Sequence, residues 1–312
     1  MRRFLGWAVL ALLAVAAGAL LWLYQSRVAL RAEPVRGDVH VLVGRGGNVG
    51  VLGTERGAVV VDTLGLRMQG EAVRERVEAL TGREVQLVLN THYHRDHTRG
   101  NLGFPLQTSI VATERTRAHL LRWDVEAFSG EATGALPNRL VKKSQRFELG
   151  GKTILALHPG RGHTDGDLVV LFEEDGVLHT GDLFFHRHYP FVDLEAGGSI
   201  PAWIESLERV LALDFERVIP GHGEPGDRAD LAQFQRFLRE LWREVEEAAQ
   251  AGLSLEQTLD RVELREAEGY APLGLPGLQR ADRESIIRQA FEEAVQRASK
   301  GASGAPGQGG AG

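Results

Sequence analysis

The stretch Thr91 to His97 reads THYHRDH and follows an apolar segment that predicts a β-strand. His92 and His94 are two residues apart, so their side chains point the same way in an extended or loop conformation. Asp96 and His97 follow at once and can face a second ion beside the first. Imidazole and carboxylate groups are ligands that zinc and related divalent metals favour. The stretch therefore predicts a metal site at the end of a strand.

Three further candidate ligands lie far along the chain, each beside a predicted strand. His163 stands in HPGRGHTDGD before DLVVLF, Asp182 in HTGDLFF after GVLH, and His222 in PGHGEP after RVI. Loops at strand ends are where a rigid scaffold brings together ligands from distant positions. Any one of the three, taken alone, could be an ordinary turn residue. Their order after the first cluster indicates one composite site.

The composition narrows the class of protein. The chain has 312 residues, of which 43% are hydrophobic, and a formal net charge of -6. This is the composition of a globular protein with a substantial core, and the charge argues against nucleic acid as a partner. Cysteine is absent. Disulfides and thiolate ligands are thus excluded, and any metal must be held by histidine and carboxylate.

The N-terminal segment predicts a membrane anchor. Residues 4–24 carry no charge, and a helix of that length spans roughly 30 Å, the thickness of the hydrocarbon core of a bilayer. Arginines flank the run on both sides, and a lone N-terminal span usually leaves its short end inside. We therefore expect residues 1–34 to anchor a catalytic domain that lies outside the cytoplasm. The alternatives are a cleaved signal peptide, which would leave a secreted or periplasmic protein, and a soluble helix.

Strands and helices alternate from there to residue 250. The predicted strands are 39–43, 49–54, 58–62, 85–89, 109–112, 153–157, 168–172, 176–179 and 217–219, and the predicted helices are 68–80, 114–123, 200–213 and 227–250. A meander comes first, strands and helices then alternate, and the pattern repeats after about residue 150. This order predicts an α/β fold of four layers, an αββα sandwich.

The chain divides into four predicted parts. The anchor and linker occupy 1–34, the catalytic domain 35–250, and a helical C-terminal extension 251–300. Residues 301–312, GASGAPGQGGAG, are of low complexity and predict a disordered tail.

The sequence resembles the metallo-β-lactamase superfamily over roughly residues 39–241. The HxHxDH string and the later GHT, TGD and PGHG turns all match the motifs of that family. The resemblance implies two metal ions and divides the ligands between them: His92, His94 and His163 for the first, Asp96, His97 and His222 for the second, and Asp182 bridging both. It also implies that Asp62 orients a ligand from behind. Zinc is the expected metal, and iron or manganese is compatible with a bridging carboxylate.

The chemistry that the resemblance implies is metal-assisted hydrolysis. Two ions about 3.5–4 Å apart share a water and lower its pKa towards neutrality, which gives a bridging hydroxide as nucleophile. Asp182 would hold the ions together, and Asp96 would accept or relay the proton. His186, His188 and Tyr189 are expected to overhang the site and to contact the substrate or an oxyanion. A polar lid without a catalytic role is the alternative for these three.

The superfamily carries out many reactions on one scaffold, so the fold does not identify the substrate. The positions at which this sequence differs from particular members of the superfamily are more informative. Asp182 stands where the β-lactamases of the family commonly have Cys or Ser, and it resembles the bridging residue of hydroxyacylglutathione hydrolases, lactonases and phosphodiesterases. The expected function is hydrolysis of an ester, thioester, lactone or lactam of a small molecule. β-Lactamase-like or hydroxyacylglutathione hydrolase-like activity is the alternative. A non-haem iron oxidoreductase on the same fold fits less well, because the dioxygenases use one metal and the di-iron enzymes carry an acidic residue at the place of His94. A membrane-anchored binding protein with a relict fold also fits less well, because relics tend to lose ligands and this site has all seven. The oligomeric state is left open.

Overall fold

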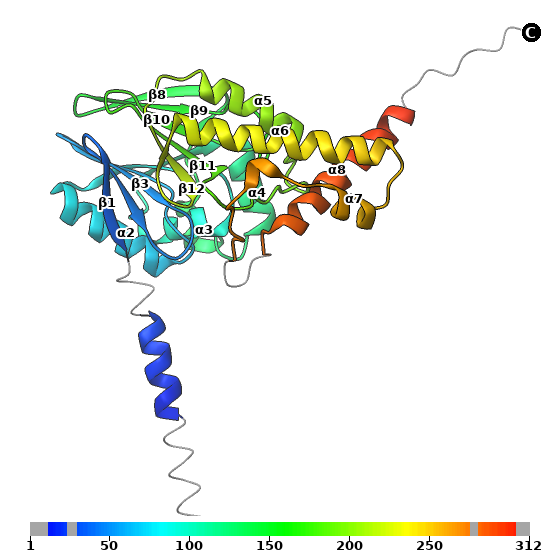
Figure 1. Cartoon of the computed structure of the whole chain (residues 1–312). Helices are drawn as coiled ribbons and strands as arrows, with labels where there is room; N and C mark the ends of the chain where they lie inside the picture. The colour runs from blue at the N-terminus through cyan, green and yellow to red at the C-terminus, as the bar shows by residue number, and fades with distance from the viewer. Residues whose placement is uncertain (1–11, 24–29, 275–279, 304–312) are drawn as a thin grey trace, which may run out of the picture.

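Two β-sheets packed face to face form the centre of the molecule (Figure 1). The computed structural model describes residues 12–23, 30–274 and 280–303. The first sheet has the strand order β1-β2-β3-β4-β5-β6-β7, and the second has the order β13-β12-β11-β10-β9-β8. The strands are β1 (Arg31–Arg36), β2 (Val39–Val43), β3 (Val49–Thr54), β4 (Gly57–Val61), β5 (Val85–Leu89), β6 (Ser109–Thr113), β7 (Arg139–Val141), β8 (Ser144–Leu149), β9 (Lys152–Leu157), β10 (Val169–Phe172), β11 (Val177–Phe185), β12 (Arg217–His222) and β13 (Gly226–Asp227). The helices are α2 (Arg67–Thr81), α3 (Arg95–Thr98), α4 (Glu114–Trp123), α5 (Ile200–Leu211), α6 (Arg228–Gln250), α7 (Leu255–Arg261) and α8 (Arg283–Ser303), with short 3-10 helices η1 (Arg99–Gly103), η2 (Gly130–Ala135) and η3 (Arg265–Ala267).

Alternating apolar side chains along the strands explain the layers. On β4, Val61 lies in the core between the sheets, whereas its neighbour Val60 lies in the cluster beneath α2. On β10, Val170 faces the same central core and Leu171 faces the helices that cover the second sheet. Successive side chains on a strand point to opposite faces, and each buried Val or Leu contributes about 1.5–3 kcal/mol. The expected αββα arrangement is confirmed.

The C-terminal helices belong to the outer layer of the second sheet. Trp203 of α5, Phe234 of α6 and Ile287 of α8 lie in one buried cluster with Leu178 of β11. The described helices of the segment predicted as an extension, 251–300, thus pack into the cluster between the second sheet and the helices that cover it. Helix α6 runs along the second sheet in the upper part of Figure 1, with α8 beside it.

Parallel strands bring the ends of both sheets to one edge. Strands β4, β5, β6 and β7 run parallel in the first sheet, as do β11 and β12 in the second. The two edges are joined by backbone hydrogen bonds, from Leu168 N to Thr91 O (2.7 Å) and from Asn48 N to Gly221 O (2.8 Å). The loops that follow these strands therefore meet at one place.

Several predicted boundaries differ from the structure. Strand β1 begins at Arg31, inside the predicted linker, and β7, β8 and β13 were not predicted because their sequences lack a clear apolar alternation. Strand β11 continues to Phe185 and does not end at residue 179, so Asp182 lies within a strand. The glycine of the TGD motif suggested a turn, but every residue of β11 is buried between neighbouring layers. Helix α8 extends to Ser303, past the predicted start of the tail.

The predicted anchor is only partly described. Residues 12–23 are helical, and their apolar side chains are exposed, for example Leu12 at 70% and Val15 at 71%. In the part of the chain that the structure describes, no helix is long and apolar enough to cross a membrane. The remainder of the apolar run at 4–24 lies outside the described residues, as does the tail from residue 304.

Candidate metal centre

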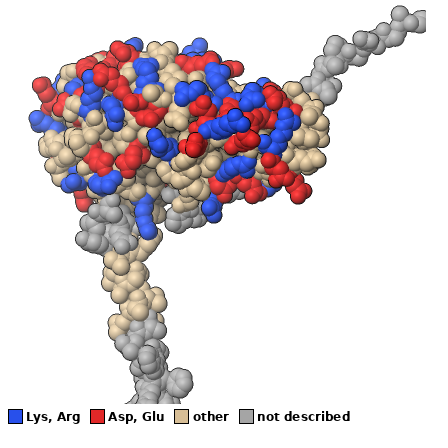
Figure 2. Space-filling model, viewed as in Figure 1, with Lys and Arg blue, Asp and Glu red and all other residues tan. Residues whose placement is uncertain are grey.

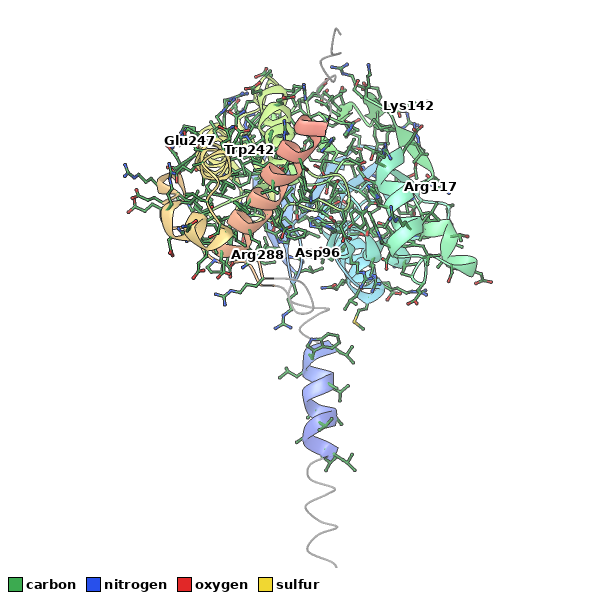
Figure 3. All side chains as sticks on the ribbon, turned by 90° about the vertical axis from the view of Figure 1, so that its right-hand side faces the viewer. Asp96, Arg117, Lys142, Trp242, Glu247 and Arg288 are labelled. Carbon is green, nitrogen blue, oxygen red and sulfur yellow. The ribbon has the colours of Figure 1, made fainter. Side chains whose placement is uncertain are left out.

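Seven His and Asp side chains converge where the strand ends of the two sheets meet. In each of two groups, the ligating atoms lie within 4.8 Å of one another: His92, His94, His163 and Asp182 in the first, and Asp96, His97 and His222 in the second. Asp182 Oδ1 lies 3.2 Å from His97 Nε2 and 3.5 Å from His222 Nε2, so this carboxylate lies between the groups. The structure thus brings together all seven predicted ligands in the predicted division. Figure 3 shows Asp96 at the lower edge of the domain.

Asp62 holds the HxHxDH loop from behind. Its carboxylate accepts hydrogen bonds from Thr91 N (2.8 Å), Thr91 Oγ1 (2.7 Å) and His97 Nδ1 (2.7 Å). Asp62 has a left-handed backbone conformation, with φ of 63°. Such strain persists where surrounding contacts determine the geometry, and it concentrates at functional sites. Asp62 thus lies where its predicted orienting role requires.

The imidazoles of the first group turn lone pairs toward one another. His94 Nε2 donates to Asp193 Oδ2 (3.0 Å) and His163 Nδ1 donates to Phe191 O (2.7 Å). A neutral imidazole that donates through one nitrogen has a lone pair on the other. His94 Nδ1 nevertheless lies 2.8 Å from His163 Nε2 and 3.1 Å from His92 Nε2. Lone pairs this close repel unless a cation or proton lies between them, so the donor set fits a metal ion.

The second group carries excess negative charge. His97 Nε2 and Asp182 Oδ1 are buried without a hydrogen-bond partner, and buried polar atoms rarely stay unpaired unless an ion or water satisfies them. Burial lowers the pKa of His222, but Asp182 and Asp96 outweigh that effect and raise it to about 9. Burial lowers the pKa of His163 in the first group to about 4. The second group therefore attracts a cation, and the imidazole of His163 is neutral and ready to bind one.

A cavity of about 530 Å³ opens onto the cluster. Its walls are mainly aromatic and apolar, with acidic groups from several parts of the chain and the amide of Gln289. The residues that line it outside the ligand set are Tyr93, Arg95, Trp123, Asp124, Phe185, Phe191, Val192, Asp193, Leu194, Glu195, Leu273, Ala281, Gln289 and Glu292. Helix α8 thus supplies part of the wall.

The three residues predicted to overhang the site lie elsewhere. His186 Nδ1 donates to Glu224 O (2.6 Å), His188 Nδ1 lies 2.8 Å from the His186 carbonyl, and Tyr189 packs against α6. None of them is among the described residues that line the cavity. Arg187, which lies between His186 and His188, has a left-handed backbone conformation with φ of 58°. A substrate contact by these three stays a prediction that the cavity does not support.

Asp193 and Tyr93 are site residues that the sequence analysis missed. Tyr93 OH donates to Asp193 Oδ2 (2.5 Å), the oxygen that also accepts from His94. Burial raises the pKa of Asp193, but the hydrogen bonds from His94 and Tyr93 outweigh it and hold that pKa well below its usual range. The only available signal was the aspartate at the end of FFHRHYPFVD. In that segment the sequence analysis assigned a role to the histidines and the tyrosine and none to the aspartate.

Replacement of Asp193 should loosen the first ligand group. We expect Asp193→Asn to weaken metal binding by about 10–100-fold, because the outer partner of a metal-bound histidine fixes its orientation and basicity. Competition with a chromogenic chelator measures the affinity. Asp165→Asn is the matched control, since Asp165 Oδ1 lies 2.6 Å from His119 Nε2 outside the ligand set. Equal affinity in the two variants would show that Asp193 does not position His94.

The fold and the site define a class of protein, an αββα sandwich with a buried His/Asp metal-binding cluster at its strand ends. The model of one family, the Metallo-beta-lactamase superfamily, matches residues 42–222, which include all seven ligands. The chain belongs to the metallo-β-lactamase superfamily, a superfamily of metallo-hydrolases.

Relatives within the superfamily bear different names. The chain is 25% identical over 203 residues to 2,4-dinitroanisole O-demethylase subunit alpha of Nocardioides sp. (strain JS1661), covering 64% of this chain and 59% of the relative. It is 30% identical over 238 residues to a hydroxyacylglutathione hydrolase of Methylococcus capsulatus, covering 68% and 83%. A metallo-beta-lactamase from Pontibacter korlensis superposes with a TM-score of 0.58 at 20% identity, covering 67% and 99%. The last likeness shows the fold alone, and the chain spans less than two thirds of the demethylase subunit.

Proposed function

We propose that the chain is a dinuclear metal hydrolase that cleaves an ester, thioester, lactone or lactam bond of a small molecule. The observation that carries the proposal is the pair of ligand groups joined by Asp182, with lone pairs and unpaired oxygens turned inward. Two divalent ions held there, zinc by ligand type and iron or manganese as alternatives, would lower the pKa of a water and polarise the scissile carbonyl.

The residues of the chain have separate tasks in this proposal. Asp182 keeps the two groups together, and its carboxylate balances the charge of both. The Asp96 side chain is 14% exposed and lines the cavity, so it can accept or relay the proton of the attacking nucleophile. Trp123 and Phe191 supply apolar contact area for the body of the substrate.

A thioester is the second, narrower candidate for the substrate. The hydroxyacylglutathione hydrolase relative is matched over 83% of its own length. The cavity offers Arg95 as the one basic lining residue among those described, and Asp124 Oδ1 lies 3.5 Å from its Nε. A strongly anionic thiol carrier therefore finds little charge to hold it, and we rank simple esters and thioesters together.

A substrate panel combined with metal analysis tests the function. The panel is a p-nitrophenyl ester, an aryl thioester, a γ-lactone, a chromogenic β-lactam and an aryl phosphodiester. We expect two equivalents of metal per chain and metal-dependent cleavage of at least one carbonyl substrate. Full activity with a single equivalent would contradict the dinuclear site, and cleavage of the phosphodiester alone would contradict the carbonyl chemistry.

We also propose that the N-terminal run anchors the domain to a membrane, with the domain outside the cytoplasm. The described part, residues 12–23, is uncharged and exposes its apolar side chains. The full chain should sediment with membranes, resist extraction by salt and yield to detergent, whereas a chain that begins at Arg31 should be soluble and still hydrolyse substrate. Protease added outside should digest the domain. Recovery of a shortened soluble chain would indicate a cleaved signal peptide, and protection from protease would reverse the orientation.

A further inference from the structure

The chain enters the catalytic domain beside the metal centre. Arg31 begins β1, where it pairs with Val43, and the loop 44–48 follows β2 directly. The Arg31 guanidinium lies 3.5 Å from Glu224 Oε1, two residues beyond the ligand His222. The entry point of the N-terminal segment is therefore at the metal-centre edge of the sandwich.

The connection to the apolar helix is short. Leu30 packs against the cluster beneath the first sheet, and only residues 24–29 separate it from the described helical residues 12–23. A chain of that length reaches at most roughly 25 Å whatever its conformation. Figures 1 and 3, which share a vertical axis, both show the helix below the domain, and Figure 3 shows Asp96 at the lower edge that faces it. A surface that holds the helix must consequently lie near the metal-centre edge.

Two loops pack around Asp96 at this edge. A Cβ placed on Gly46 would lie 3.4 Å from Asp96 Cβ, and one on Gly65 would lie 3.4 Å from Asp96 Cα. The Gln69 side chain ties these loops together, since it donates to Arg45 O (3.0 Å) and accepts from Gly65 N (3.1 Å). The loops at 44–48 and 64–67 and the start of α3 thus form one continuous surface.

This surface carries a rim of exposed arginines, which we call the basic rim: Arg31, Arg45, Arg67 and Arg95. Figure 2 shows basic side chains, with acidic ones among them, along the side of the domain that faces the helix. Arg31 and Arg67 have acidic neighbours in exposed or partly exposed ion pairs, with Glu224 at 3.5 Å and Glu71 at 3.2 Å, whereas Arg95 lies 3.5 Å from the buried Asp124. Exposed ion pairs are worth at most about 1 kcal/mol. The guanidinium groups of Arg31 and Arg67 can therefore exchange these partners for phosphate oxygens, which they bind in bidentate fashion.

The cavity opens at the same rim. Arg95 belongs to the basic rim and also lines the cavity, next to Asp96. The lining also includes Trp123, Phe191 and Leu194, which suit an apolar group. The mouth thus combines a phosphate-binding edge with an apolar interior.

We propose that the basic rim lies against the phospholipid headgroups of a bilayer that holds the N-terminal helix, so that the cavity takes an amphiphilic ester or thioester with an apolar acyl chain from the membrane surface. The proposal rests on the proposed anchor and hydrolase function, and it adds the docked orientation and the substrate class. Each arginine near an anionic lipid surface contributes about 1 kcal/mol, or about a fivefold change in the docking equilibrium.

A pair of single-cysteine variants tests the orientation. The chain has no cysteine, so a fluorophore attached to Arg45→Cys or to Lys142→Cys reports one position. Lys142 is the control because its side chain is 82% exposed and lies at the far end of the domain from the helix (Figure 3). The full chain is reconstituted in phosphatidylcholine vesicles that contain a headgroup-nitroxide lipid. We expect quenching at position 45 and none at position 142. Equal quenching at both, none at position 45, or failure of the chain to float with the vesicles overturns the proposal.

A charge variant tests the rim and the substrate class. Arg67→Gln should shift the docking equilibrium reported at position 45 about fivefold, and phosphatidylglycerol in the vesicles should strengthen docking. Arg146→Gln is the matched control, because Arg146 on β8 is also an exposed arginine in an ion pair. Its side chain is 62% exposed, and its Nε lies 2.9 Å from Glu173 Oε1.

The same variant tests the substrate class. Arg67→Gln should lower kcat/KM for a dodecanoyl thioester presented in vesicles and leave kcat/KM for a soluble acetyl thioester unchanged. An equal effect on both thioesters overturns the proposal. If neither thioester nor the matching esters are cleaved, the proposed acyl substrate fails, while the quenching result still decides the orientation. The proposed hydrolase function fails only if no carbonyl substrate of the panel, the lactone and the lactam included, is cleaved.

Discussion

Asp182→Asn is expected to lower turnover by three orders of magnitude or more while the sandwich stays folded. The carboxylate lies between the two ligand groups, with His92 Nε2 at 3.8 Å from one oxygen and His97 Nε2 at 3.2 Å from the other. An amide has the same shape, but it removes the charge that joins the groups and turns an N–H donor toward one of them. A thousandfold loss corresponds to about 4 kcal/mol of transition-state stabilisation. The measurement is kcat on the best substrate of the panel, with circular dichroism as the check on folding.

The control for this variant is another buried carboxylate. Asp175 accepts from Lys152 Nζ (2.9 Å) and Asp38 N (3.0 Å) in the turn before β11, away from the ligand set. Asp175→Asn should cost some stability and leave turnover within about twofold, because its ion pair with Lys152 and its hydrogen bond from Asp38 N lie outside the ligand set. Near-normal turnover of Asp182→Asn would show that the bridging assignment is wrong.

Removal of metal should abolish activity and lower the unfolding temperature by about 10 °C. An ion present at about a thousand times its dissociation constant stabilises the folded state by about 4 kcal/mol, and each kcal/mol shifts the midpoint by about 2–4 °C in a domain of this size. Asp62, Asp96 and Asp182 also lose their compensating charge in a buried site. Differential scanning calorimetry with and without chelator measures the shift, and activity should return with two equivalents of metal.

The same calorimetric experiment on Asp182→Asn distinguishes the effect of metal removal from a direct effect of the chelator on the protein. That variant should show a much smaller shift on chelation, since the ligand shared by both groups is gone. A full return of activity after one equivalent of metal would argue for a single ion. An unfolding temperature that chelation does not change would mean that the ligand groups bind no metal in the native protein.

The ligand set was predictable because each ligand stands in a short local pattern. His92, His94, Asp96 and His97 lie within six residues, and the distant ligands each follow or precede a recognisable strand. A substrate contact by His186, His188 and Tyr189 stays a prediction, and none of the three is among the described residues that line the cavity. Arg187 between them has a left-handed conformation that arginine rarely adopts, so no side-chain pattern indicates it.

The sequence alone indicated which His and Asp side chains would form one candidate metal-binding cluster, and the alternation along β4 and β10 indicated that two sheets would share a core. Both follow from local chemistry, the ligand type and the period of two along a strand. The tertiary structure alone decided which nitrogen of each histidine faces the cluster, since that depends on Asp193, 99 residues from His94. It also decided that α8 would wall the cavity and that the N-terminal segment would enter beside Asp96. Such contacts join residues far apart in the chain, and they arise only when both sheets and their helices have packed.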